Sequence, residues 1–119
     1  MQDTQEVLQE IDDNMAALGK VTSSQLLAFG NLSKAVKSAG ALDEKTKELI
    51  GLALAVASHC HWCIAIHTKN ALRQGATKEE ILEAGWVAVQ MGGGPSLMYL
   101  QEVQKALEDL TKVTSATET

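Results

Sequence analysis

The sequence predicts an all-α fold, from its composition and from the spacing of its apolar residues. Hydrophobic residues make up 45% of the 119 residues and charged residues 21%, proportions that are typical of a globular domain rather than a disordered chain. Aromatic residues account for only 3%, and the chain has a single proline. The core must therefore be built from Leu, Ala, Val and Ile, with few of the residues that strands favour. The length suits one domain, so we expect residues 1–119 to form a single helical unit.

Apolar residues recur with the 3.6-residue period of an amphipathic helix through the first half of the chain. Gly19 and Gly40 are expected to follow the ends of the first two helices, because glycine readily takes the conformation that ends a helix. Thr22 or Ser23 is the expected N-cap of the second helix, and Asp43 that of the third. The third helix is apolar on nearly every side after its charged first turns, which predicts burial on every side. These three predicted helices cover residues 7–18, 23–39 and 44–57.

The second half of the chain carries equally clear start and stop signals. Gly75 is the expected C′ residue of the fourth helix. The segment from Thr77 to Glu80 is a capping box that opens the fifth helix, on whose apolar side Trp86 is expected to lie in the core. Pro95 follows three glycines and suits the first turn of the sixth helix. Those glycines lack the strand and the Lys-Ser/Thr pair of a phosphate-binding loop, so they indicate a helix break. These helices cover residues 60–74, 81–91 and 95–110, which makes about six in total.

The charge of the chain excludes several classes of partner. The net charge is −5 and the pI is about 5.1, and no cluster of Lys and Arg occurs. A nucleic-acid partner or an anionic membrane surface is therefore not expected. The longest apolar run, residues 49–58, is too short to span a bilayer, and residues 1–10 are too polar for a secretory signal. We expect a cytoplasmic protein.

The residues that carry chemistry are concentrated between Ser58 and His67. The only two cysteines, Cys60 and Cys63, lie three positions apart, a spacing that indicates redox or metal use. The alternative is that both are small buried apolar residues. If Cys60 opens a helix, Cys63 and His67 follow at one-turn intervals on the same face. The helix N-terminus and a nearby imidazolium both favour a thiolate, and His67 is suited to move the thiol proton.

Glu48 is the predicted fourth member of this site. The third and fourth helices are expected to pack as an antiparallel hairpin, in which residues equally far from the turn lie level. That geometry places Glu48 beside His67, where a carboxylate would orient the ring and stabilise its protonated form. The alternative is a surface ion pair between Glu48 and Lys45. The hairpin thus predicts a Glu48–His67–Cys63 relay with Cys60 as the partner thiol.

A zinc site is a weaker interpretation of the same segment. His59 and His61, together with the cysteines and His67, supply the thiolate and imidazole ligands that zinc prefers. Structural zinc sites normally take their ligands from two separated pairs, however, and the sequence has no second pair. We therefore expect neither a bound metal nor a cofactor.

These residues resemble the signature of a known family. The pattern Glu48, eleven residues, Cys60-x-x-Cys63, three residues, His67 is similar to that of the alkylhydroperoxidase D-like branch of the carboxymuconolactone decarboxylase family. The segments 75–77, 79–81 and 91–95 are similar to the family's frame, and the resemblance covers residues 42–110. One difference is Trp62, because the best-understood peroxidase members have a histidine immediately before the second cysteine.

The resemblance implies an all-α fold with a central helix hairpin, symmetric homo-oligomers (commonly hexamers built as trimers of dimers) and the thiol-dependent reduction of hydroperoxides. In that reaction Cys60 and Cys63 are the redox pair, His67 shuttles the proton and Glu48 orients His67, while a thiol or dithiol reductant restores the pair. An oligomer is also expected because so small a core cannot readily cover the apolar surface of the chain.

Two arguments bear on which cysteine attacks the peroxide. Cys60 gains more from the helix dipole, whereas Cys63 has His67 as a positioned base, which normally contributes more. We therefore expect Cys63 to attack and Cys60 to resolve. The alternatives to a peroxidase are the family's decarboxylase, a lyase acting on a muconolactone, and a non-catalytic oligomeric binding module.

Overall fold

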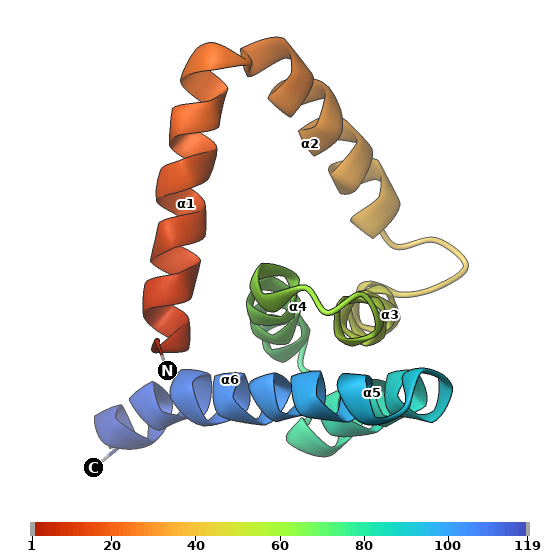
Figure 1. The fold of residues 1–119 in the computed structure, drawn as a ribbon. Coiled ribbons are helices and arrows are strands. Elements are labelled where there is room, and N and C mark those ends of the chain that lie inside the picture. The colour runs from red at the N-terminus through yellow and green to blue at the C-terminus, as the bar shows by residue number, and fades with distance from the viewer. Residues whose placement is uncertain (1, 119) are drawn as a thin grey trace.

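The computed structural model describes residues 2–118, and the side chains of residues 2–112 (Figure 1). In this part of the chain every regular element is a helix, which confirms the predicted all-α class. None of these helices combines the length and the hydropathy that a membrane span requires. The helices are α1 Thr4–Val21, α2 Ser23–Lys37, α3 Glu44–Ala57, α4 His61–Arg73, α5 Lys78–Gly92 and α6 Gly94–Glu118.

The core lies between the last four helices. Helices α3 and α4 form the predicted hairpin, and both α5 and α6 pack against it (Figure 1). Cys63 is partly buried and packs against the edge of this core. The largest fully buried apolar side chains of the core are those of Leu52, Val56, Ile64, Ile81, Val103 and Leu107.

Helices α1 and α2 stand away from this core as the two sides of an arch (Figure 1). Only the first half of α1 is packed, where Val7 and Ile11 contact Ala65 of α4. Helix α2 has no buried residue at all, although it carries an amphipathic stripe. The large exposed apolar residues of α2 are Leu27, Phe29, Leu32 and Val36.

The arch explains why one prediction about α3 is wrong. Complete burial was expected, but Ile50 is 46% exposed and Leu54 is 64% exposed. The face of α3 that carries them points toward α2, which lies too far away to cover it. The burial of this face of α3 therefore depends on the position of α2, which cannot be predicted from the composition of α3.

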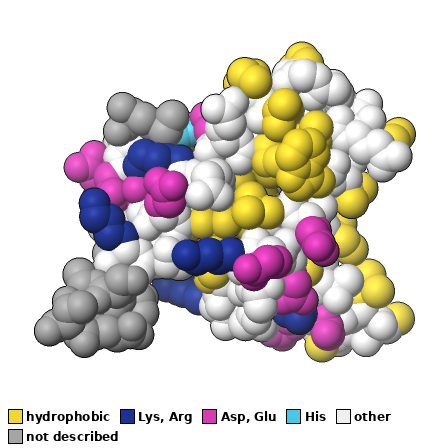
Figure 2. All heavy atoms as spheres, turned by 90° about the horizontal axis from the view of Figure 1, so that it is seen from below, with side chains coloured by type: hydrophobic (Ala, Val, Ile, Leu, Met, Phe, Trp, Pro, Cys, Tyr) yellow, Lys and Arg dark blue, Asp and Glu magenta, His cyan; other side chains and the backbone are white. Residues whose placement is uncertain are grey.

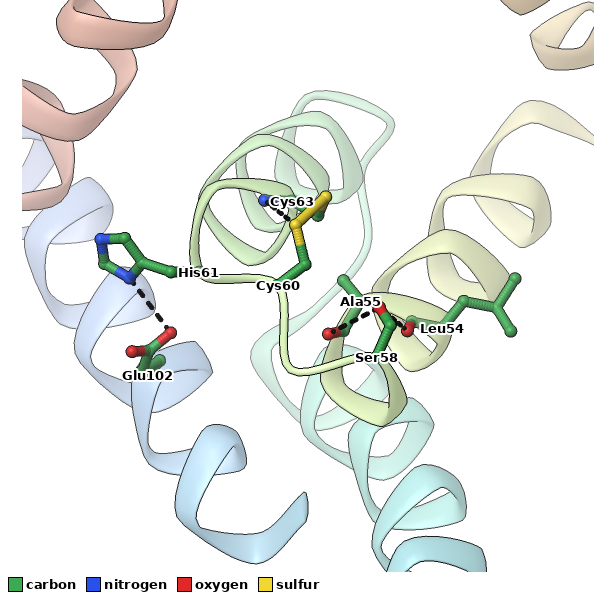
Figure 3. Close-up of a disulfide and its surroundings, with 7 residues drawn as sticks. All are labelled: Leu54, Ala55, Ser58, Cys60, His61, Cys63 and Glu102. Atoms are coloured by element: carbon green, nitrogen blue, oxygen red, sulfur yellow. Dashed lines mark hydrogen bonds and ion pairs between the residues drawn. A yellow bond between two sulfur atoms is a disulfide. The ribbon is translucent and has the colours of Figure 1, made fainter. Parts of the chain in front are cut away.

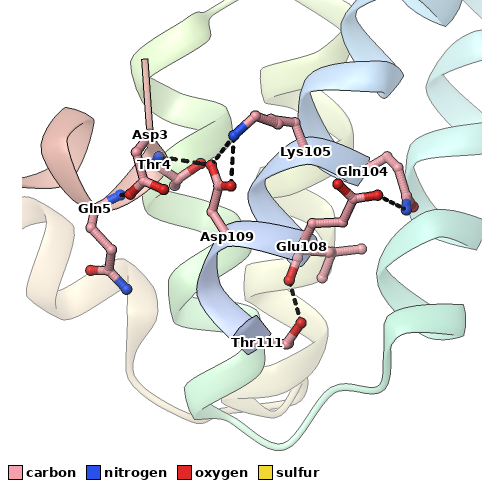
Figure 4. A network of polar contacts seen from close by, with 9 residues as sticks. Asp3, Thr4, Gln5, Gln104, Lys105, Glu108, Asp109 and Thr111 are labelled. Atoms are coloured by element: carbon pink, nitrogen blue, oxygen red, sulfur yellow. Dashed lines mark hydrogen bonds and ion pairs between the residues drawn. The ribbon is translucent and has the colours of Figure 1, made fainter. Parts of the chain in front are cut away.

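The start of α1 is tied to α6 by a buried polar network (Figure 4). Asp109 Oδ2 accepts hydrogen bonds from the backbone N–H of Thr4, at 2.9 Å, and from its hydroxyl, at 2.8 Å. The ammonium of Lys105 donates to both oxygens of the same carboxylate at 2.6 Å. Burial raises the pKa of Asp109, but these hydrogen bonds outweigh it and leave the pKa below its ordinary value.

Trp86 does not lie in the core, contrary to the prediction, and is 52% exposed. The inward face of α5 is formed instead by Ile81, Gly85 and Ala88. A β-carbon on Gly85 would collide with the side chain of Leu100, so the packing of α5 against α6 requires glycine at this position. Trp86, Val87 and Met91 of α5 are exposed, and hydrophobic side chains gather on the face seen in Figure 2.

Most helix boundaries follow the predicted local signals. Asp43 caps α3, and Thr77 and Glu80 form the complete capping box of α5. Gly75 has the expected positive φ of 86°. Three predicted ends were wrong, since α1 runs on to Val21, α2 stops at Lys37 rather than near Gly40, and α6 runs to Glu118 rather than to residue 110. At the end of α2, Lys47 of α3 donates to the carbonyl of Val36 and to that of the C-cap residue Ser38, which satisfies carbonyl groups that the end of a helix leaves free.

Candidate active site

The turn between α3 and α4 holds Cys60 by its backbone and by its side chain. The N–H of His59 donates to the carbonyl of Val56 at 3.2 Å, and the N–H of Cys60 donates to that of Ala55 at 3.0 Å. This pair of bonds is a Schellman motif, with His59 in its left-handed position at φ 55°. Cys60 is also the N-cap of α4, because its Sγ accepts the N–H of Cys63 at 3.2 Å (Figure 3). One residue thus ends one helix and begins the next.

Cys60 and Cys63 are joined by a disulfide bond (Figure 3). Their Cα atoms are 5.2 Å apart, within the usual range for a disulfide. Both residues are partly buried, at the border between the core and the surface. The pairing favours the redox interpretation of the motif over that of two inert apolar side chains.

Glu48 and His67 meet across the hairpin, as its geometry predicts. His67 Nδ1 lies 2.8 Å from Oε2 of Glu48. The glutamate side chain is only 8% exposed and that of the histidine 26% exposed, so solvent screens this contact little. The alternative pair with Lys45 does not form, because Lys45 bonds to Glu80 of α5 at 2.9 Å. The nearest cation to Glu48 is instead Lys37 of α2, at 4.0 Å from Oε1.

Gly51 supports the histidine ring and was missed by the sequence analysis. A β-carbon at this position would lie 2.7 Å from Cε1 and 2.8 Å from Nδ1 of His67. Only glycine therefore leaves room for the ring beside α3, within reach of Glu48. The sequence does contain an indication of this role. A glycine inside a helix destabilises it by about 1 kcal/mol relative to alanine, so its presence there indicates a packing or functional requirement.

A cavity of about 670 Å³ opens beside this pair, between α2 and α3. Glu48, Gly51 and His67 form part of its wall, and neither cysteine is among its lining residues. The cavity therefore gives access to the ring of His67 rather than directly to the sulfur atoms. The remaining wall is largely apolar and includes Phe29, Leu32, Val36, Ile50 and Leu54.

The link between His67 and Cys63 is not formed in this disulfide-bonded state. Among the described residues, His67 bonds to Glu48 and to neither sulfur atom. The structure therefore brings together two pairs of residues: Glu48 of α3 with His67 of α4, and Cys60 with Cys63 at the start of α4. A relay between the pairs requires the freed Cys63 thiol to turn toward the ring.

The other two histidines are directed toward α6. His61 Nδ1 lies 3.2 Å from Glu102 Oε2 (Figure 3), and His59 stacks on the ring of Tyr99. Within residues 2–112, no three side chains of the types that bind metals lie close enough to share an ion. The ligands that a zinc site would need are therefore not gathered.

Comparisons with known proteins agree on one family. The carboxymuconolactone decarboxylase family model matches residues 26–106. A solved structure of a member of this family from Legionella pneumophila is 43% identical and superposes with a TM-score of 0.85 over 88% of this chain and 94% of that one. A member from Thermotoga maritima, for which a role in antioxidative response has been suggested, is 32% identical with a TM-score of 0.84 over 96% and 97% of the two chains.

An uncharacterized Paracoccus denitrificans protein of the cox locus is 42% identical over 98 residues, which are 80% of this chain and 88% of that protein. The match covers the helix hairpin, and the Cys60–Cys63 pair fits the alkylhydroperoxidase D-like branch. The chain belongs to the carboxymuconolactone decarboxylase family.

Proposed function

We propose that this protein is a thiol-dependent peroxidase that reduces hydroperoxides with the Cys60–Cys63 pair. The observation that carries the proposal is the disulfide at the N-terminus of α4, one helical turn before the histidine that Glu48 orients. A reversible disulfide stores two electrons, which is what the reduction of one hydroperoxide consumes. The suggested antioxidative role of the Thermotoga maritima relative is consistent with such a reaction.

The reaction begins with the dithiol form. The Cys63 thiolate attacks the terminal oxygen of ROOH, the O–O bond breaks, and the leaving alkoxide takes a proton to become ROH. Cys63 is then a sulfenic acid, and the Cys60 thiol attacks its sulfur, which forms the disulfide and releases water. An external dithiol reduces the disulfide by exchange and is itself oxidised.

In this reaction His67 accepts and returns a proton, and Glu48 orients the His67 ring. The Glu48 carboxylate accepts from Nδ1–H of His67, which leaves Nε2 as the acceptor for the Cys63 thiol proton. Glu48 also stabilises the imidazolium that results. His67 then returns the proton to the leaving alkoxide.

The substrate is proposed to enter through the cavity between α2 and α3, where the ring of His67 is accessible. We further propose a cytoplasmic homo-oligomer, a hexamer built as a trimer of dimers, with neither a nucleic-acid nor a membrane partner. The exposed apolar residues of α2 support the oligomer, because a monomer would leave them in water.

The test is peroxide consumption by the purified protein with dithiothreitol as the reductant. Turnover is expected for the wild type, with loss in both Cys60→Ser and Cys63→Ser. Absence of turnover with hydrogen peroxide and with an organic hydroperoxide would contradict the proposal. A parallel assay of muconolactone decarboxylation identifies the lyase alternative, and inactivity in both assays favours a binding module.

A further inference from the structure

We propose that His59 is a positioning residue for the redox pair: by stacking on Tyr99, it holds the α3–α4 turn so that Cys60 Sγ stays on the N-terminus of α4. The inference rests on the proposed redox function of the cysteines. It concerns the state of the Cys60 thiol, however, which can be measured without any peroxide.

The turns that follow α3 and α4 have the same hydrogen-bond pattern but different residues in the left-handed position. At the end of α4, Gly75 N–H donates to the carbonyl of Leu72 and Ala76 N–H to that of Ala71, both at 3.0 Å. These bonds repeat the pattern at the end of α3. The left-handed position is occupied by Gly75 in the α4–α5 turn and by His59 in the α3–α4 turn. Glycine takes this conformation freely, whereas a residue with a β-carbon is strained there.

A contact with α6 offsets the strain at His59. Its ring stacks on that of Tyr99 with the centroids 4.6 Å apart and the planes 3° from parallel. Tyr99 is itself packed against the core. Glycine at position 59 would adopt the left-handed conformation without strain, but it would lack the ring that contacts Tyr99 of α6. The histidine ring therefore connects the redox turn to the rigid part of the molecule.

The residue held by this connection is Cys60. It follows His59 directly, its N–H completes the turn, and its Sγ accepts the N–H of Cys63 in the first turn of α4. After reduction, that N–H and the helix N-terminus stabilise a thiolate at Cys60 only while the sulfur keeps its place. Stabilisation of the Cys60 thiolate lowers the free energy of the reduced form, so the disulfide is reduced more readily. Loss of the stack should therefore make Cys60 less acidic and the disulfide harder to reduce.

Two measurements test this. The first is the rate of alkylation of Cys60 by iodoacetamide as a function of pH, in the Cys63→Ser background where Cys60 is the only thiol. The second is the dithiol–disulfide equilibrium against glutathione, with both cysteines present. The variants are His59→Gly, which relieves the turn and removes the ring; Tyr99→Leu, which removes the stacking partner; and Tyr99→Phe, which retains a ring.

In His59→Gly and Tyr99→Leu, we expect the midpoint pH of alkylation to rise by about half a unit and the equilibrium to favour the disulfide up to about threefold more, the effect expected from a helix N-terminus. Tyr99→Phe should behave as the wild type. His59→Gly should melt no lower than the wild type, which separates positioning from stability. Gly75→His, the matched change in the other turn, should lower the melting temperature and leave both thiol measurements unchanged.

Unchanged thiol measurements in His59→Gly would overturn the proposal, whatever Tyr99→Leu does. The result is independent of peroxidase activity. A shift in a protein that turns over no peroxide would support the positioning role and contradict the proposed function alone.

Discussion

The imidazole of His67 and the carboxylate of Glu48 meet at 2.8 Å across the α3–α4 hairpin, although nineteen positions separate them in the chain. Glu48 lies near the start of α3 and His67 in the middle of α4, so the contact exists only because the hairpin is antiparallel. The carboxylate is almost fully buried and faces one ring nitrogen, which in the proposed reaction leaves the other nitrogen available for proton transfer. Three of the five predictions below concern this pair and the cysteines beside it.

Glu48→Gln should lower the rate of peroxide reduction about tenfold to a hundredfold, the usual effect of removing the group that orients a functional histidine. Glutamine keeps the shape of the side chain but removes the charge that stabilises the imidazolium. Peroxide consumption measures the effect, and circular dichroism verifies the fold. Glu44→Gln, an exposed change on the same helix, is the control. A rate within twofold of the wild type in Glu48→Gln would argue against the relay.

Gly51→Ala should reduce activity without unfolding the protein. The added methyl group would lie 2.7 Å from Cε1 of His67 and must displace the ring from Glu48. Gly30→Ala in α2 is the matched control, since no atom lies within 4 Å of its added β-carbon. The control should keep full activity and gain about 0.5–1 kcal/mol of stability from helix propensity. Full activity in Gly51→Ala would show that the position of the ring does not limit the rate.

The two thiols should differ when the sulfenic acid is trapped. In Cys60→Ser, peroxide should yield a sulfenic acid at Cys63 that dimedone labels, and His67→Ala should slow its formation. The N-cap position of Cys60 Sγ argues for the opposite order, because the helix N-terminus favours a thiolate there. Mass spectrometry of the labelled peptide identifies the sulfur. A sulfenic acid trapped only at Cys60, in Cys63→Ser, would reverse the assignment.

The assembly should be larger than a monomer. We expect light scattering at micromolar concentration to give a mass about six times the 12.7 kDa of the chain. Leu32→Glu places a charge in the exposed apolar stripe of α2 and should reduce the mass, whereas Gln25→Glu on the same helix should leave it unchanged. A monodisperse monomer of the wild type would contradict the expectation.

Asp109→Asn should destabilise the protein by about 1–3 kcal/mol at neutral pH, the usual cost of disturbing a buried hydrogen-bonded charge. Because the folded-state pKa of Asp109 lies below the unfolded value of 3.8, its carboxylate contributes stability above that value. The contribution is lost as the pH falls through the folded-state pKa. The gap between the melting temperatures of the two proteins should therefore narrow below about pH 4.

Asp12→Asn, an exposed change in α1, is the control for this series and should leave the melting temperature unchanged at every pH. A constant gap between wild type and Asp109→Asn down to pH 2 would show that the charge of Asp109 does not stabilise the start of α1.

Local signals determined the helices and the positions of the site residues along them. The cap at Asp43, the capping box from Thr77 to Glu80 and the turn at Gly75 all lie where the sequence predicted. These features depend on interactions within about five residues, which the sequence reports directly. The Glu48–His67 contact was also predictable, because a hairpin of two helices of known length leaves little choice of register.

Tertiary structure alone decided which helix faces are covered and what the turn residues touch. Trp86 is exposed because Ile81, Gly85 and Ala88 form the inward face of α5, and Ile50 is exposed because α2 stands away from α3. The contact of His67 with Gly51 and the stack of His59 on Tyr99 depend on how whole helices cross. The angle and distance at which two helices cross result from many weak contacts between residues far apart in the chain. A local sequence pattern does not report the sum of those contacts.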